Sequence, residues 1–129
     1  MPQTSPKVAV IEDDHDLQFI YKLKLEREGF SVCVAGNGAE GLEVVERFRP
    51  DIILLDLMMP VMSGTEMLAR LREKEWAGNI RVVVLTNISK TEAPAALRFL
   101  AVDRYVVKAH HTPAQVIRII REVLDSGVT

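Results

Sequence analysis

The fold of this chain is decided by the stretch DIILLD, residues 51–56. Its middle, residues 52–55, is a run of large apolar side chains, which is typical of a parallel strand buried on both faces of a sheet. Pro60 and Gly64 follow, so the strand gives way to a turn at Asp56. Ligand sites in open α/β sheets lie at the carboxyl ends of the strands, and we therefore expect the Asp56 carboxylate to face such a crevice.

Three other apolar runs also end in polar residues. If all of them are parallel strands, their carboxyl ends meet at one edge of the sheet, where carboxylates, a hydroxyl and an ammonium would converge. The runs and the residues that end them are 8–11 with Glu12, Asp13 and Asp14, 80–85 with Thr86, and 105–107 with Lys108.

Length and composition restrict the function. The 129 residues suffice for one domain with a sizeable core. With 16 basic and 18 acidic residues and no clustered basic face visible, we expect neither nucleic acid nor a membrane as a partner. The single cysteine, Cys33, cannot form an internal disulfide, and the sequence has no signal peptide and no run of 18 or more apolar residues. We therefore expect a cytoplasmic protein.

The spacing of apolar residues predicts helices between the strands. An alternating edge strand is expected at residues 30–34, and Thr112 before Pro113 has the pattern of a helix N-cap. Five strands alternating with five helices predict an α/β fold, a (βα)5 three-layer sandwich around a parallel sheet, but periodicity leaves the strand order open. The predicted helices cover about 14–28, 42–48, 65–75, 91–100 and 113–124.

Taken together, the polar strand ends resemble the receiver domain of two-component response regulators. The resemblance extends over roughly residues 7–124 and implies a flavodoxin-like strand order, 2-1-3-4-5. We accordingly expect a receiver domain at residues 7–125, between a flexible segment at 1–6 and a tail at 126–129. The residues that carry the resemblance are Glu12-Asp13 after the first strand, Asp56 with Met59-Pro60 and Gly64 behind it, Thr86, and Lys108 after Tyr105.

Charge alone predicts a cation among the acidic side chains. Glu12, Asp13 and Asp56 would bring three negative charges within a few ångströms, and each pair at 4 Å costs about 4 kcal/mol at an effective dielectric constant of 20. Lys108 and one Mg²⁺ would neutralise them, and Mg²⁺ prefers carboxylate, water and phosphate oxygens. The resemblance implies that Asp13, Asp56 and the main-chain carbonyl of Met58 ligate the ion directly, and Glu12 through water.

The resemblance also implies the function. Asp56 would accept a phosphoryl group from a sensor histidine kinase or a phosphotransfer protein, with Lys108 and the Thr86 hydroxyl stabilising the transferred group. Thr86 and Tyr105 would then form a switch that changes the surface of the fourth helix, fifth strand and fifth helix, where a downstream target protein docks. Such a domain is no enzyme in the ordinary sense, because it assists only its own phosphorylation and dephosphorylation. We expect a monomer or a phosphorylation-dependent dimer.

The sequence departs from the family pattern at three positions. Ala109 replaces the usual proline after Lys108, so the preceding peptide bond is either trans or a strained cis bond. Asn87 replaces a smaller residue after Thr86, and its amide would crowd the path of water to the phosphoryl group and slow its loss. Ala101 stands where a glycine commonly ends the fourth helix, so that helix would run on or end without a left-handed cap.

Three other functions are compatible with parts of the pattern. A dehalogenase-type hydrolase needs a second aspartate two positions after Asp56, where this chain has Met58. A flavin-binding protein of this fold needs a phosphate-binding loop where this chain has Glu12 and Asp13. A degenerate receiver would keep the fold and act as a phosphate-independent interaction module. Five residues after Leu124 leave open whether the chain signals alone by docking or was cut from a larger regulator.

Overall fold

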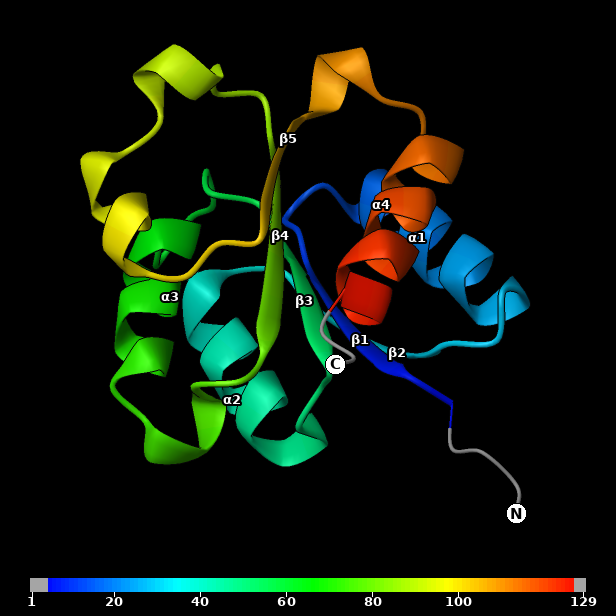
Figure 1. The fold of residues 1–129 in the computed structure, drawn as a ribbon, viewed down its shortest axis with the longest axis horizontal. Coiled ribbons are helices and arrows are strands. Elements are labelled where there is room, and N and C mark those ends of the chain that lie inside the picture. The colour runs from blue at the N-terminus through cyan, green and yellow to red at the C-terminus, as the bar shows by residue number, and fades with distance from the viewer. Residues whose placement is uncertain (1–4, 127–129) are drawn as a thin grey trace.

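The computed structural model describes residues 5–126 as a parallel five-stranded sheet with helices on both faces (Figure 1). The sheet order is β2-β1-β3-β4-β5, which confirms the flavodoxin-like order 2-1-3-4-5. The expected flexible segment 1–6 and tail 126–129 fall almost entirely outside the described residues, so these boundaries stay predictions. The strands are β1 (Lys7–Ile11), β2 (Ser31–Ala35), β3 (Ile52–Leu55), β4 (Arg81–Thr86) and β5 (Arg104–Val107).

Within residues 5–126, four α-helices cover the sheet, with α1 and α4 on one face and α2 and α3 on the other (Figure 1). In the part of the chain described, no helix is long and apolar enough to cross a membrane. The helices are α1 (His15–Arg27), α2 (Gly38–Phe48), α3 (Gly64–Arg72) and α4 (Pro113–Ser126).

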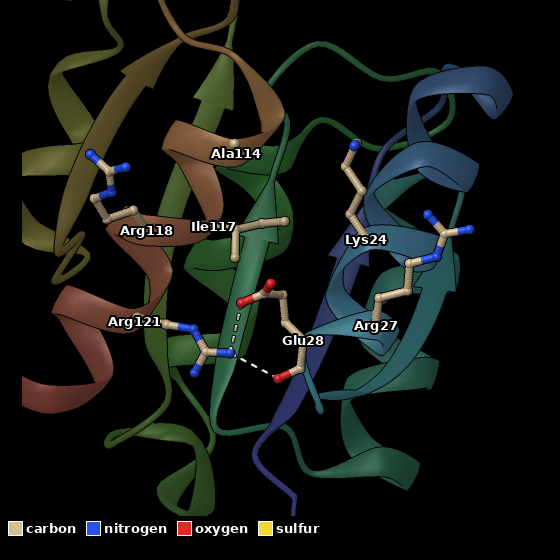
Figure 2. Close-up of a pocket in the computed structure, with 7 residues that line it drawn as sticks. All are labelled: Lys24, Arg27, Glu28, Ala114, Ile117, Arg118 and Arg121. Carbon is tan, nitrogen blue, oxygen red and sulfur yellow. Dashed lines mark hydrogen bonds and ion pairs between the residues drawn. The ribbon is translucent and has the colours of Figure 1, made fainter.

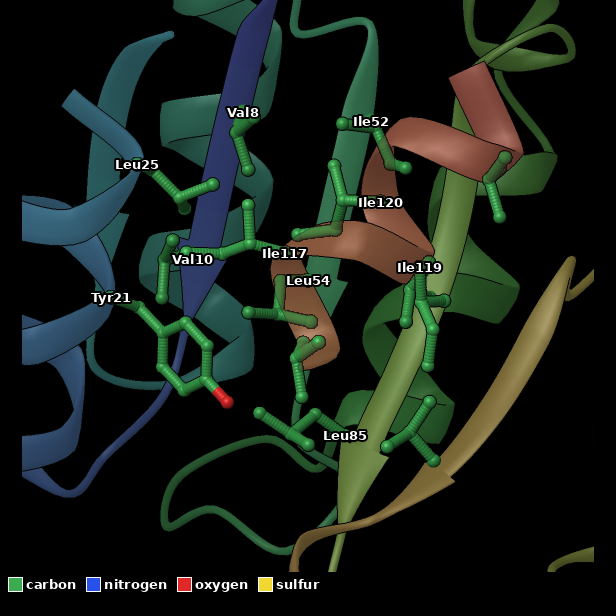
Figure 3. Packing of buried hydrophobic residues seen from close by; sticks show 14 of the residues in the cluster. Val8, Val10, Tyr21, Leu25, Ile52, Leu54, Leu85, Ile117, Ile119 and Ile120 are labelled. Atoms are coloured by element: carbon green, nitrogen blue, oxygen red, sulfur yellow. The ribbon is translucent and has the colours of Figure 1, made fainter. Parts of the chain in front are cut away.

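The alternation of side chains along the central strands divides the core into two layers. Val8 and Val10 of β1 pack with α1 and α4, as Figure 3 shows, while Ala9 and Ile11 pack with α2 and α3. All four residues of β3 are buried, which confirms that the run at 52–55 is a strand covered on both faces. Because both faces are filled with apolar side chains, the polar residues of the central strands are confined to the strand ends.

The prediction of a fourth α-helix was wrong. Residues 88–101 instead form two short 3-10 turns, Lys90–Glu92 and Ala95–Phe99. Pro94 lies between them, and it disfavours the helical conformation for Ala93, which is extended at φ −61° and ψ 141°. The segment ends at Ala101 with φ 54°, so a left-handed residue closes it although it is no glycine.

Arg72 at the end of α3 holds the end of this segment. Its guanidinium donates hydrogen bonds to the carbonyls of Leu100 at 2.9 Å and Ala101 at 3.1 Å. A third bond, at 2.8 Å, goes to the carbonyl of Ala77. These bonds fix the chain where it enters β5.

Among the described residues no peptide bond is cis, so the bond between Lys108 and Ala109 is trans.

The loop from Asp56 to α3 contains a tight turn centred on Val61. The backbone N–H of Met62 donates to the carbonyl of Pro60 at 2.7 Å, and Val61 between them has φ 69°. A β-branched residue is unfavourable in this left-handed region, where an L-residue pays about 1–2 kcal/mol. The Val61 side chain is 83% exposed, so packing does not compensate for this cost.

We expect Val61→Gly to stabilise the protein by about 0.5–1 kcal/mol. The substitution removes the strain energy of the left-handed conformation, and this gain exceeds the entropic cost of the greater freedom of glycine in the unfolded chain. Urea unfolding at equilibrium would measure the difference. Val61→Ala is the matched control, because it keeps the Cβ and should change stability little. A destabilised Val61→Gly would contradict the assignment of strain to this turn.

Candidate functional site

Three carboxylates gather where β1 and β3 end. Glu12, Asp13 and Asp56 each place one oxygen so that the three atoms lie within 4.8 Å of one another. Glu12 is 3% exposed and Asp56 is 5% exposed, whereas Asp13 is open to solvent. Two nearly buried carboxylates and one exposed carboxylate therefore share a small volume at the edge of the sheet.

Lys108, which follows β5, brings the nearest positive charge. Its Nζ lies 2.7 Å from Oε1 of Glu12 and 3.1 Å from Oδ2 of Asp56. Burial acts to lower the pKa of Lys108, but its bonds to Glu12 and the charge of Asp56 outweigh that effect and raise the pKa. Lys108 therefore stays a positively charged ammonium. Its ion pairs with Glu12 and Asp56 connect the end of β5 to the ends of β1 and β3.

The pKa of Glu12 is raised to about 7, chiefly because burial disfavours its charged form. The hydrogen bond from Lys108 and one from the N–H of Asp14, at 3.0 Å, act in the opposite direction. The charge of Asp56 raises the pKa further. One ammonium thus compensates the carboxylates only in part, and the cluster has a net negative charge that would attract a second cation.

The backbone holds Asp56 at the rim of the sheet. Its N–H donates to the carbonyl of Ile11 at 3.0 Å, and its Oδ1 accepts from the N–H of Met58 at 3.3 Å. A Cβ at Gly64 would overlap the carbonyl oxygen of Asp56, so only glycine permits this approach. The close passage of α3 past the strand end explains why Gly64 belongs to the motif.

Two further side chains fix the start of α1 beside the cluster. The Asp14 carboxylate caps α1 by accepting from the N–H groups of Asp16 and Leu17, both at 3.1 Å. The amide of Gln18 donates to the carbonyls of Glu12 at 2.9 Å and Ala35 at 3.1 Å, which ties β1 to β2. The sequence reasoning missed Gln18, because a glutamine on a helix gives no signal of its own.

Thr86 and Tyr105 are linked to each other through Ile88. Thr86 is fully buried at the end of β4, next to β3, and its Oγ1 accepts from the N–H of Ile88 at 3.5 Å. The Tyr105 hydroxyl donates to the carbonyl of Ile88 at 2.7 Å. Within the described residues, Thr86 has no hydrogen bond to Asp56, so the two side chains lie at the same rim without a direct bond between them.

The donor set fits a hard divalent cation. It consists of oxygens from three acidic side chains, which face one ammonium. Such oxygens suit Mg²⁺ better than softer metals, which prefer sulfur or imidazole ligands. The N–H of Met58 points to Asp56, which places the Met58 backbone at the same loop. The predicted residues Glu12, Asp13, Asp56 and Lys108 are therefore brought together.

Comparisons with known proteins agree with this geometry. The model of the response regulator receiver domain family matches residues 8–121. The phosphate regulon transcriptional regulatory protein PhoB of Rhizobium meliloti is 35% identical over 116 residues, which are 88% of this chain and 50% of PhoB. The chain thus spans about half the length of this relative.

Two solved structures share the fold. A CheY-like response regulator receiver domain protein from Methanospirillum hungatei JF-1 has a TM-score of 0.86 and 25% identity, with 95% of each chain covered. The response regulator protein TrrA from Thermotoga maritima, solved in complex with Mg(2+)-BeF, has a TM-score of 0.79 and 25% identity, covering 92% of this chain and 98% of TrrA. With the family model matching most of its length, the chain belongs to the response regulator receiver domain family.

Proposed function

We propose that Asp56 accepts a phosphoryl group from a phosphohistidine of a sensor histidine kinase or phosphotransfer protein, in a reaction that requires Mg²⁺. The observation that supports this most directly is Lys108, whose Nζ lies 3.1 Å from Asp56 and 2.7 Å from Glu12 in a cluster of three carboxylates. We place the reaction in the cytoplasm, where the lone Cys33 stays reduced.

Asp13, Asp56 and the main-chain carbonyl of Met58 would hold the metal ion, and Glu12 would bind it through water. When bound, Mg²⁺ neutralises negative charge on the oxygens of the transferred phosphoryl group. The similarity to TrrA, which was solved with Mg(2+)-BeF, supports this choice of ion. The exposed Asp13 leaves the cluster open to solvent, which would let a hydrated ion enter.

The transfer would form one bond and break another. An Asp56 carboxylate oxygen attacks the phosphorus while the bond from phosphorus to the histidine nitrogen breaks, and the imidazole leaves with that electron pair and takes up a proton. The Lys108 ammonium, already beside Oδ2 of Asp56, compensates charge on the phosphoryl oxygens. The product is an aspartyl phosphate, and the protein assists only its formation and loss.

The added phosphoryl group would change the loop after β4. Three phosphoryl oxygens would draw the Thr86 hydroxyl away from the N–H of Ile88, a bond of 3.5 Å that is easily given up. Because Tyr105 is bonded to the carbonyl of Ile88, a shift of that loop would also move Tyr105. This route would connect Asp56 to the surface of residues 88–101, β5 and α4.

Two exposed regions would serve as partner surfaces. Phe19, Ile20 and Leu23 form an apolar patch on α1, within three turns of the acidic cluster, and we propose it as the place where the kinase docks. Phe99 is 84% exposed in the 3-10 segment, on the surface that we propose for the downstream target. The first region would receive the incoming partner, and the second would present the surface to the outgoing one.

We expect one added phosphoryl group when the protein is incubated with acetyl phosphate and Mg²⁺, and intact-mass measurement would detect it. Asp56→Ala should abolish the modification, because it removes the nucleophilic oxygen. Asp125→Ala is the matched control, since Asp125 is an exposed acid on α4 and should leave the modification unchanged.

Chelation of the metal should have the same effect as Asp56→Ala. A wild-type protein that stays folded yet gains no phosphoryl group would contradict the proposal. That result would favour a degenerate receiver, which acts as a phosphate-independent interaction module.

Asn87, which is exposed directly after Thr86, should prolong the lifetime of the phosphorylated state. We expect Asn87→Ala to lose phosphate several-fold faster, because a smaller side chain opens the path of water to phosphorus. The decay of the phosphorylated mass at fixed Mg²⁺ would measure this. Equal lifetimes of wild type and variant would show that Asn87 does not shield the group.

A further inference from the structure

The two faces of the sheet reach the acidic cluster in different ways. In the groove between α1 and α4, Arg121 donates to the carbonyl of Glu28 at 2.8 Å and to its carboxylate at 3.0 Å (Figure 2). Glu28 follows α1 at the opposite end of that helix from Asp14, so this contact lies away from the acidic cluster. On the other face, the start of α2 lies against the loop of residues 57–63, which follows Asp56. A contact on this second face can therefore bear on the phosphoryl site.

That loop carries Met58, whose main-chain carbonyl we propose as a metal ligand. The loop closes on itself, because the N–H of Gly64 donates to the carbonyl of Leu57 at 3.0 Å. In the part of the chain described, one hydrogen bond connects the loop to a distant segment: the N–H of Gly38 donates to the carbonyl of Met62 at 3.0 Å. Gly38 is therefore the backbone anchor of this loop.

The N–H of Gly38 is free to make this bond because of its place in α2. Gly38 is the first residue of that helix, and the first N–H groups of a helix have no partner inside it. Asn37 caps the helix by accepting from the N–H of Glu40 at 2.9 Å, and this leaves the N–H of Gly38 to the loop. The bond to Met62 thus satisfies a donor of α2 and holds the loop at the same time.

A side chain on the first residue of α2 would not fit beside the loop. A Cβ at Gly38 would lie 2.6 Å from the carbonyl oxygen of Met62 and 2.9 Å from that of Ser63. These are backbone atoms, so no change of rotamer relieves the overlap. Withdrawal of α2 would instead open a gap where Gly41 packs closely against Met67 of α3. The loop is therefore the part that would move.

A displacement of Met62 would reach Met58. The far end of the loop is fixed, since Gly64 lies against the carbonyl of Asp56. Near Met62 the backbone is stiff, because Pro60 has a fixed φ and the 2.7 Å bond from the N–H of Met62 to its carbonyl closes a tight turn. The stretch between Asp56 and Pro60 would therefore take up the displacement, and Met58 lies in that stretch.

We propose that Gly38 is a positioning residue for the metal site, because it holds Met62 and thereby sets where the Met58 carbonyl lies relative to Asp56. This inference rests on the proposed function, in which Met58 and Asp56 ligate Mg²⁺. Mg²⁺ requires near-ideal octahedral geometry, so a displaced carbonyl weakens its binding although the charge of the cluster is unchanged. Gly38 would act through Met62 and Met58 and supply no ligand of its own.

Titration of the full chain with Mg²⁺, followed by backbone amide chemical shifts, would test this role in Gly38→Ala. We expect this variant to bind Mg²⁺ about tenfold more weakly than the wild type, as the loss of contacts that support a metal ligand commonly does. The matched control, Gly36→Ala, should bind as the wild type does, because a Cβ at Gly36 would meet nothing within 4 Å. Phosphorylation by acetyl phosphate at saturating Mg²⁺ should fall far less than the affinity, since Asp56 and Lys108 are unchanged.

Hydrogen exchange in the wild type gives a second measurement that needs no variant. Because coupling is reciprocal, bound Mg²⁺ should slow exchange at the Gly38 amide and leave the Gly36 amide, which donates to Glu40, unchanged. Equal Mg²⁺ affinities of the two variants, with circular dichroism showing both folded, would overturn the proposal, as would an exchange rate at Gly38 that does not respond to Mg²⁺. A wild type that binds no Mg²⁺ would contradict the proposed function itself and this inference with it.

Discussion

The site depends on the Lys108 ammonium lying between Glu12 and Asp56. Two nearly buried carboxylates repel each other by about 4 kcal/mol at 4 Å and an effective dielectric constant of 20, so a cation between them is required. Lys108 supplies one charge and leaves the cluster negative, because Asp13 adds a third carboxylate. This imbalance would bind a divalent ion, whose charge would then offset the negative charge of a phosphoryl group.

The parallel sheet makes this arrangement possible. Its central strands are buried on both faces, and their polar residues are confined to the first and last positions and the residues that follow. The order β2-β1-β3-β4-β5 brings the ends of β1 and β3 side by side, with β4 and β5 following on one side. Residues that are far apart in the sequence thus meet at one rim, while Asp14 starts α1 and Gly64 starts α3 beside them.

Much of this could be predicted from the sequence, because local patterns determine it. The run at residues 52–55 indicates a strand buried on both faces, and the polar residues that follow the strands indicate the rim. The resemblance to receivers supplied the strand order, which periodicity left open. The partners of Lys108 followed from charge, since three clustered acids need a cation.

Other features depend on contacts that no local pattern reveals. Pro94 outweighs the helical spacing of Leu97 and Leu100, so residues 88–101 form 3-10 turns instead of the predicted helix. Lys24 of α1 and Arg118 of α4 line the same groove only because the two helices pack against each other. Ala101 takes the left-handed conformation expected of glycine, held by the bond from Arg72 to its carbonyl.

The most direct test of the central claim is a titration with Mg²⁺ followed by backbone amide chemical shifts. The account predicts saturable shifts centred on Glu12, Asp13, Asp56 and Met58, and their loss in Asp13→Asn with the fold intact. Shifts that never saturate, that centre elsewhere, or that persist unchanged in Asp13→Asn would contradict a magnesium site at this rim of the sheet.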